Sequence, residues 1–184
     1  MKKVVFAIGL TVMSINFLMA QDKLFTKTGT INFDASADLE TITASNKKAT
    51  CVVDTKTGAM EFAVLMKGFE FEKALMEEHF NENYVESDTY PKATFKGKID
   101  NLSEIKFTTD GTYTANISGD LTMHGVTKAT SAKGSFTVKG GKVTGASKFK
   151  VTLSDYNISI PAVVQANINK EATIMVDVSL EPLN

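Results

Sequence analysis

Arginine and tryptophan are missing from this sequence, and all 20 basic residues are lysines. Without arginine the chain has no planar fork of N–H donors, so an anionic ligand would have to be held by lysine ammonium groups or backbone N–H groups. The formal net charge of the 184 residues is only -1 at pH 7. A nucleic-acid-binding domain needs a strongly basic surface, and we therefore expect no nucleic-acid partner.

Cysteine is scarce as well, since the chain contains only one. This residue, Cys51, cannot form a disulfide within the chain, so the stability of the fold has to come from packing. Its nearby basic residues are Lys47 and Lys48, and this setting favours a buried, unreactive thiol over a nucleophile. A chain of this length buries roughly 70% of its unfolded surface, so we expect one domain with a sizeable core.

The first twenty residues have the pattern of a secretory signal peptide. Two lysines follow the initiator methionine, Val4–Leu18 is an uncharged and mostly apolar run, and Ala20 precedes a polar stretch. The run is shorter than the roughly 20 residues that cross a bilayer as a helix, so an uncleaved anchor is the weaker alternative. We expect residues 1–20 to be removed, residues 21–184 to form one domain without a transmembrane segment, and the mature protein to be periplasmic or secreted.

The mature chain is patterned mainly as β-strands. Threonine, valine and phenylalanine are abundant, which is typical of pleated strands. Apolar residues alternate with other residues over 31–35, 60–66, 113–123 and 174–180, and a Gly-Gly turn at 140–141 separates two further runs. About eight to ten consecutive antiparallel strands are predicted, which favours an all-β fold closed into a barrel, because closure removes exposed sheet edges.

One segment departs from this alternation. Over residues 73–85 the apolar side chains recur with a period near 3.6, which places Met76, Phe80 and Tyr84 in one stripe. This pattern predicts an amphipathic helix. A second short helix is expected over residues 161–168, because proline suits the first helical position.

Motifs for catalysis or metal binding are absent. The chain has no P-loop, no G-x-S-x-G and no H-E-x-x-H sequence. His79 and His124 are 45 positions apart, so a zinc site would need the fold to bring both together with a carboxylate. Glu78 and His79 are adjacent on the expected helix and point about 100° apart, so they cannot share one proton. We expect no catalytic residue, no metal and no cofactor.

Three stretches of the mature chain combine into a specific set of motifs. The first covers residues 69–87, which include the expected helix, and continues through Tyr-Pro to Phe-Lys-Gly over residues 90–97. The second is Gly-Asp-Leu-Thr-Met-His-Gly-Val-Thr-Lys over residues 119–128, and the third joins Phe-Lys-Val at 149–151 to Asp-Tyr-Asn-Ile at 155–158. In these motifs the chain resembles the YceI-like family of exported polyisoprenoid-binding proteins.

The resemblance implies an extended, lipocalin-like antiparallel barrel with an elongated apolar cavity. The implied ligand is a polyisoprenoid, a quinone-like lipid or a fatty-chain lipid, held for carriage or storage by a monomer or homodimer without a cofactor. We expect large apolar side chains to line the cavity, with the helix stripe at or near its entrance. These residues are Phe33, Phe62, Val64, Met66, Phe95, Tyr113, Ile117, Leu121, Met123, Phe136, Phe149 and Val151, together with Met76, Phe80 and Tyr84 of the helix.

Two other kinds of function remain open at this point. A small hydrolase or isomerase acting on a bound lipid would need His79 or His124 beside the cavity mouth. An envelope scaffold protein would have a filled core and an exposed apolar patch instead. Composition does not separate a hollow barrel from a filled one, because phenylalanine and methionine suit both.

The signal-peptide pattern predicts a mature N-terminus at Gln21, because Ala20 is the small residue best placed for cleavage after the apolar run. Intact-mass measurement of the exported protein should show the loss of residues 1–20. A mass that retains Met1 would contradict this prediction.

Overall fold

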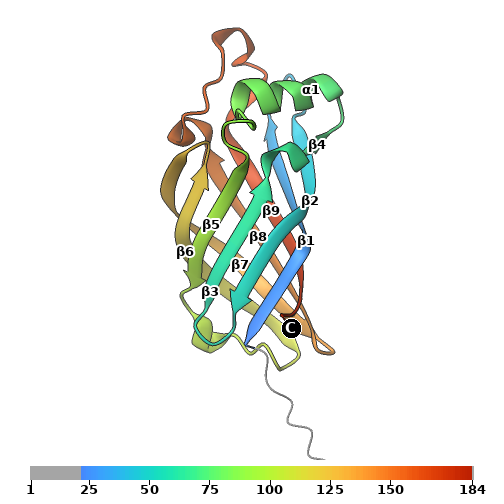
Figure 1. The fold of residues 1–184 in the computed structure, drawn as a ribbon, viewed down its shortest axis with the longest axis vertical. Coiled ribbons are helices and arrows are strands. Elements are labelled where there is room, and N and C mark those ends of the chain that lie inside the picture. The colour runs from blue at the N-terminus through green and yellow to red at the C-terminus, as the bar shows by residue number, and fades with distance from the viewer. Residues whose placement is uncertain (1–21, 184) are drawn as a thin grey trace, which may run out of the picture.

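The computed structural model describes residues 22–183, which form a closed antiparallel barrel of eight long strands (Figure 1). The expected signal peptide lies outside the described residues. Around the barrel the strands follow the order β1-β9-β8-β7-β6-β5-β3-β2, and the pairing of β1 with β2 closes the ring. The long strands are β1 (Lys23–Ser36), β2 (Thr43–Asp54), β3 (Ala59–Leu65), β5 (Lys92–Ile99), β6 (Gly111–Met123), β7 (Val126–Lys139), β8 (Lys142–Thr152) and β9 (Ile168–Pro182). The all-β, antiparallel, lipocalin-like barrel expected from the sequence is confirmed.

The remaining elements are short. Strand β4 (Glu70–Phe71) pairs with the start of β2. Single helical turns are η1 (Met66–Gly68), η3 (Leu102–Glu104), η4 (Leu153–Tyr156) and η5 (Ala162–Val164). None of the helices within residues 22–183 is long and apolar enough to cross a membrane.

The expected helix at residues 73–85 is present in place but not as one α-helix. It consists of α1 (Ala74–His79) followed by the π-helical turn η2 (Phe80–Tyr84), and we call the two together the cap, because they lie across one end of the barrel (Figure 1). The side-chain amide of Asn81 donates to the carbonyl of Glu77 at 2.9 Å. That carbonyl would accept the backbone N–H of Asn81 in an α-helix, so the side chain competes with the helical ladder at the point where it changes.

The expected second helix at residues 161–168 is also shorter than predicted. Only η5 forms there, directly after Pro161. Ile168 already pairs with Ser36 at the start of β9, so a helix cannot extend to residue 168 as expected.

Strands β1 and β2 each carry an extra residue that keeps apolar side chains on the inside. The register between them shifts once between Thr26 and Gly29 of β1 and once between Asn46 and Ala49 of β2. The fully buried Asn46 amide donates to the carbonyl of Leu65 at 2.9 Å and accepts the N–H of Lys48 at 2.9 Å. Both halves of this buried amide are therefore satisfied, and they hold the β2 bulge against the end of β3.

The buried side chains form two clusters along the barrel axis. The upper core lies at the capped end and includes Phe33, Met66 and Phe69. The lower core lies toward the opposite end and includes Val53 and Phe136.

A pair of glycines makes room for one aromatic ring inside the barrel. Gly97 of β5 and Gly119 of β6 lie opposite each other. A Cβ atom built on Gly97 would lie 2.5 Å from Cζ of Phe95, and one built on Gly119 would lie 2.7 Å from the same atom. The Phe95 ring therefore covers both glycines, and neither position accepts a side chain without displacing the ring or the backbone.

Replacement of Gly119 by alanine should destabilise the barrel by about 1–3 kcal/mol, because the new methyl group overlaps Phe95 and the neighbouring strand. Thermal unfolding should show a melting temperature lowered by about 2–4 °C for each kcal/mol. Gly140→Asn is the control, since a Cβ there meets nothing within 4 Å and asparagine tolerates its φ of 56°. If Gly119→Ala has the same melting temperature as the wild type, both Phe95 and the β5 backbone must be free to move away, and the prediction is wrong.

Candidate functional site

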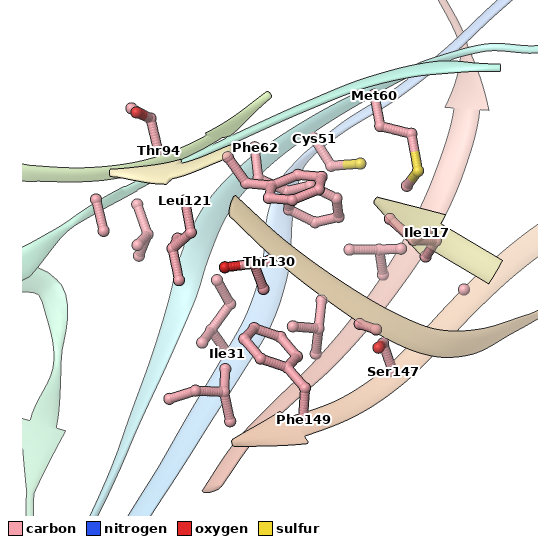
Figure 2. Close-up of a pocket in the computed structure, with 18 of the residues that line it drawn as sticks. Ile31, Cys51, Met60, Phe62, Thr94, Ile117, Leu121, Thr130, Ser147 and Phe149 are labelled. Atoms are coloured by element: carbon pink, nitrogen blue, oxygen red, sulfur yellow. The ribbon is translucent and has the colours of Figure 1, made fainter. Parts of the chain in front are cut away.

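An apolar cavity of about 150 Å³ occupies the middle of the barrel (Figure 2). The side chains of Phe62, Leu121 and Phe149 point into a common space from β3, β6 and β8. The wall from β7 and β8 is made largely of small residues, among them Ala132 and Gly145. We call this space the inner cavity. It exists because most of the β7 and β8 residues that line it, apart from Phe136, Phe149 and Val151, are small.

A second cavity of about 440 Å³ lies beneath the cap. Its lining combines cap residues with upper-core residues and the segment before β9, and we call it the outer cavity. Its volume lies within the roughly 300–1,000 Å³ typical of small-molecule pockets. The two cavities share the lining residues Met66, Phe69, Met123, Val151 and Ile174, so they lie end to end along the barrel axis.

Packed aromatic rings form much of the outer cavity's wall. Phe80 of the cap stacks on Phe33 of β1 at a centroid distance of 5.4 Å. It also lies 5.7 Å from Phe69 and 5.1 Å from Phe71. These contacts fasten the cap to the barrel through apolar surface, whose attraction has no fixed direction.

The polar side chains at the outer cavity come from three segments that are distant in the sequence. Glu40 in the β1–β2 connection forms an ion pair with Lys73, directly before α1, at 3.6 Å. The amide of Asn167, directly before β9, donates to the other carboxylate oxygen of Glu40 at 3.2 Å. Glu40 therefore joins the cap, the β1–β2 connection and the start of β9 at this end of the barrel.

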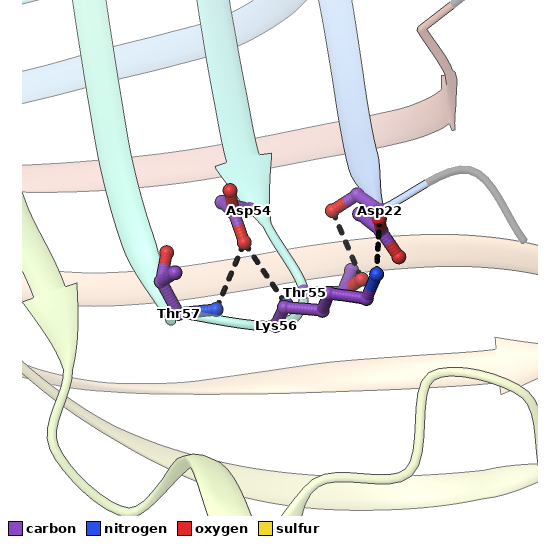
Figure 3. A network of polar contacts seen from close by, with 5 residues as sticks. All are labelled: Asp22, Asp54, Thr55, Lys56 and Thr57. Atoms are coloured by element: carbon purple, nitrogen blue, oxygen red, sulfur yellow. Dashed lines mark hydrogen bonds and ion pairs between the residues drawn. The ribbon is translucent and has the colours of Figure 1, made fainter.

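The opposite end of the barrel is tied by a separate polar network (Figure 3). The carboxylate of Asp54 accepts the backbone N–H groups of Lys56 and Thr57 at 3.0 and 2.8 Å, and the bond from Thr57 contributes most to holding the pKa of Asp54 below its ordinary value. Lys56 also forms an ion pair with Asp22 at 2.6 Å. The lower core fills the barrel next to this network, whereas the outer cavity lies at the capped end.

Burial makes both cavities unfavourable for charge. Cys51, which lines the inner cavity, is 1% exposed, and burial raises the pKa of its thiol to about 12. Burial also raises the pKa of Tyr84 in the outer cavity above its ordinary value. Both groups stay neutral at physiological pH, because an apolar surrounding penalises the ionised form.

Fourteen of the fifteen residues predicted from the sequence line one or both cavities. Tyr113 lies outside both: it packs against the lower core, and its hydroxyl donates to the carbonyl of Thr109 at 2.9 Å. Phe62, Val64, Phe95, Ile117, Leu121, Phe136 and Phe149 line the inner cavity, Phe33, Met76, Phe80 and Tyr84 the outer one, and Met66, Met123 and Val151 both.

Sequence reasoning missed the residues that line the cavities without being large. Thr130, Ala132 and Ala146 belong to this group, and their small size is what leaves the space. Glu40 and Asn167 were missed as well, because nothing in their local sequence marks a loop that will border a cavity. The alternation of Ile174, Val176 and Val178 was the usable signal for β9, whose inward face lines the inner cavity.

The two histidines are placed differently. His79 lines the outer cavity, whereas His124 lines neither. The Nδ1 atom of His124 lies 2.9 Å from the carbonyl oxygen of Tyr156, its Nε2 atom lies 3.4 Å from Glu86, and its ring contacts Tyr90 at a centroid distance of 4.6 Å. His124 thus links the end of the cap to the η4 turn. Within residues 22–183 no three His, Cys, Asp or Glu side chains are grouped so as to hold a metal ion.

Solved structures with the same fold are only distantly related in sequence. A polyisoprenoid-binding domain from Saccharophagus degradans superposes with a TM-score of 0.76 at 13% identity, over 89% of this chain and 99% of that domain. BcnA from Burkholderia cenocepacia superposes with a TM-score of 0.69 at 14% identity, over 83% of this chain and 96% of its own. These likenesses establish the shared fold.

Sequence comparison identifies the family. Among curated protein sequences, none matches the chain. The YceI-like domain, in contrast, matches residues 10–180, which include every strand of the barrel up to most of β9. The motifs on the cap, at the β6–β7 turn and at η4 lie within this match, and the protein therefore belongs to the YceI-like family.

Proposed function

We propose that this protein holds an isoprenoid or another long alkyl chain inside the barrel and serves to carry or store it. The observation that supports this function most directly is the pair of adjoining cavities, whose lining is almost entirely carbon. An apolar chain needs a dry, elongated space and few polar partners, and these cavities offer both.

The energetics of such a ligand follow from apolar burial. Each buried methylene contributes about 0.8 kcal/mol, so an insertion of about ten carbons supplies several kcal/mol after the cost of ordering the chain. The inner cavity of about 150 Å³ matches the size of space that stays dry and accepts a benzene-sized apolar molecule. We therefore place the end of the chain in the inner cavity and the remainder of the ligand in the outer one.

The family supports the same ligand class. The Saccharophagus degradans domain with this fold is described as polyisoprenoid-binding. The signal-peptide pattern of residues 1–20 supports export, and we propose that the protein acts in the periplasm or outside the cell.

A binding function fits the described residues better than catalysis. His79 lines the outer cavity, as the enzyme alternative requires. The buried Cys51 thiol, with its pKa of about 12, lies in the inner cavity instead, so the two do not form a nucleophile and base. A scaffold with a filled core is disfavoured by the cavities themselves.

The substitution Val64→Trp tests whether the barrel is hollow in solution. Val64 lines the inner cavity, so the indole should fill free space, exclude the alkyl chain and leave the stability of the lipid-free protein within about 1 kcal/mol of the wild type. Native mass spectrometry of protein purified without detergent measures the bound lipid, and thermal unfolding measures the stability.

Val53→Trp is the matched control. Val53 is fully buried in the lower core and lines neither cavity, so the same change should cost roughly 1–3 kcal/mol or more. The contrary result is that both variants lose stability equally and that wild-type and Val64→Trp proteins carry the same amount of lipid. The inner cavity would then be packed core, and the proposed function would be wrong.

A further inference from the structure

The cap and the residues that flank it are strongly acidic for a segment that covers an apolar cavity. Residues 70–86 contain six glutamates and a single lysine, Lys73. Anionic groups approaching the outer cavity along this segment therefore meet a negative potential, although most of the glutamates are exposed to solvent.

The lysine of this segment is already engaged. Within the described residues, Lys73 and His79 are the only basic side chains that line either cavity. The Nζ atom of Lys73 lies 3.6 Å from Glu40, so the one ammonium that borders the cavity is paired with a carboxylate. Glu40 is further fixed in place by the amide of Asn167.

Besides the imidazole of His79, the groups left for a ligand's polar end are uncharged hydrogen-bonding groups. They include the phenol of Tyr84 and the side-chain carbonyl of Asn167, whose NH₂ group already donates to Glu40. The surroundings that penalise ionisation of Tyr84 penalise a buried phosphate or carboxylate in the same way. A buried anion needs a cationic or multiple N–H partner, and the chain has no arginine to supply one.

We propose that the outer cavity selects lipids with an uncharged polar end, such as an isoprenoid alcohol or a quinone, against the corresponding phosphates and carboxylates, and that Glu40 determines this selection. The inference rests on the proposed function, since it concerns the ligand of the same cavities. Glu40 acts in two ways. Its charge repels the anionic end of a ligand, and its ion pair with Lys73 prevents that lysine from binding the anionic end.

Farnesol and farnesyl diphosphate, which share one alkyl chain, test the selection. The wild-type protein should bind farnesol at least about tenfold more tightly than farnesyl diphosphate, because like charges at the mouth oppose the second ligand. Glu40→Gln keeps the size of the side chain and frees Lys73, so it should lower the ratio of farnesol affinity to farnesyl diphosphate affinity by about tenfold. Titrations followed by native mass spectrometry or calorimetry give both affinities.

Glu171→Gln is the control variant. Glu171 pairs with Lys150 at 3.1 Å on the exposed surface, and both residues lie outside the two cavities, so the same loss of charge should change neither affinity. Equal gains in diphosphate binding for both variants would overturn the role of Glu40. A wild-type protein that binds farnesyl diphosphate as tightly as farnesol would overturn the selection but leave lipid binding intact, whereas binding of neither compound would overturn the proposed function as well.

Discussion

Closure of the sheet by the β1–β2 pairing is the constraint on which the rest of the structure depends. Once closed, every strand has one face toward a common interior, and no edge is left to pair with another chain. The extra residues in β1 and β2 are part of this closure, because they restore inward apolar faces where a strict alternation would turn outward. The buried amide of Asn46 stabilises the β2 bulge by bonding to β3. The barrel wall is thus set by backbone pairing, and its interior is left to side-chain size.

Side-chain size then decides where the interior is full and where it is hollow. In the lower core, buried side chains such as Phe136 and Val138 fill the barrel. Above them, small residues of β7 and β8 such as Ala132 and Gly145 line the interior, and space remains. Apolar burial stabilises both regions, but a cavity forgoes packing contacts that a filled core would make. Such a cost is reasonable for a protein whose ligand supplies the missing contacts, as we propose here.

The capped end is held by two kinds of interaction with different consequences. The aromatic contacts around Phe80 join the cap to the barrel without directional bonds. The ion pair of Glu40 with Lys73 instead fixes the cap at one point and places a carboxylate at the outer cavity. A carboxylate whose charge is balanced by a paired lysine is a poor partner for an anion. The Glu40–Lys73 ion pair therefore affects both the position of the cap and the class of ligand that we propose.

The sequence by itself determined the strands, the inward faces and the burial of Cys51, because alternation with period two is a local property that each strand carries alone. It also located the cap, although the π-helical turn at Phe80 depends on a side-chain bond of Asn81 that periodicity does not reveal. Only the tertiary structure decided that Tyr113 lies outside the cavities and that the barrel is hollow. The position of a side chain along the barrel axis and the free volume inside the barrel depend on all the strands together, so no single segment contains that information.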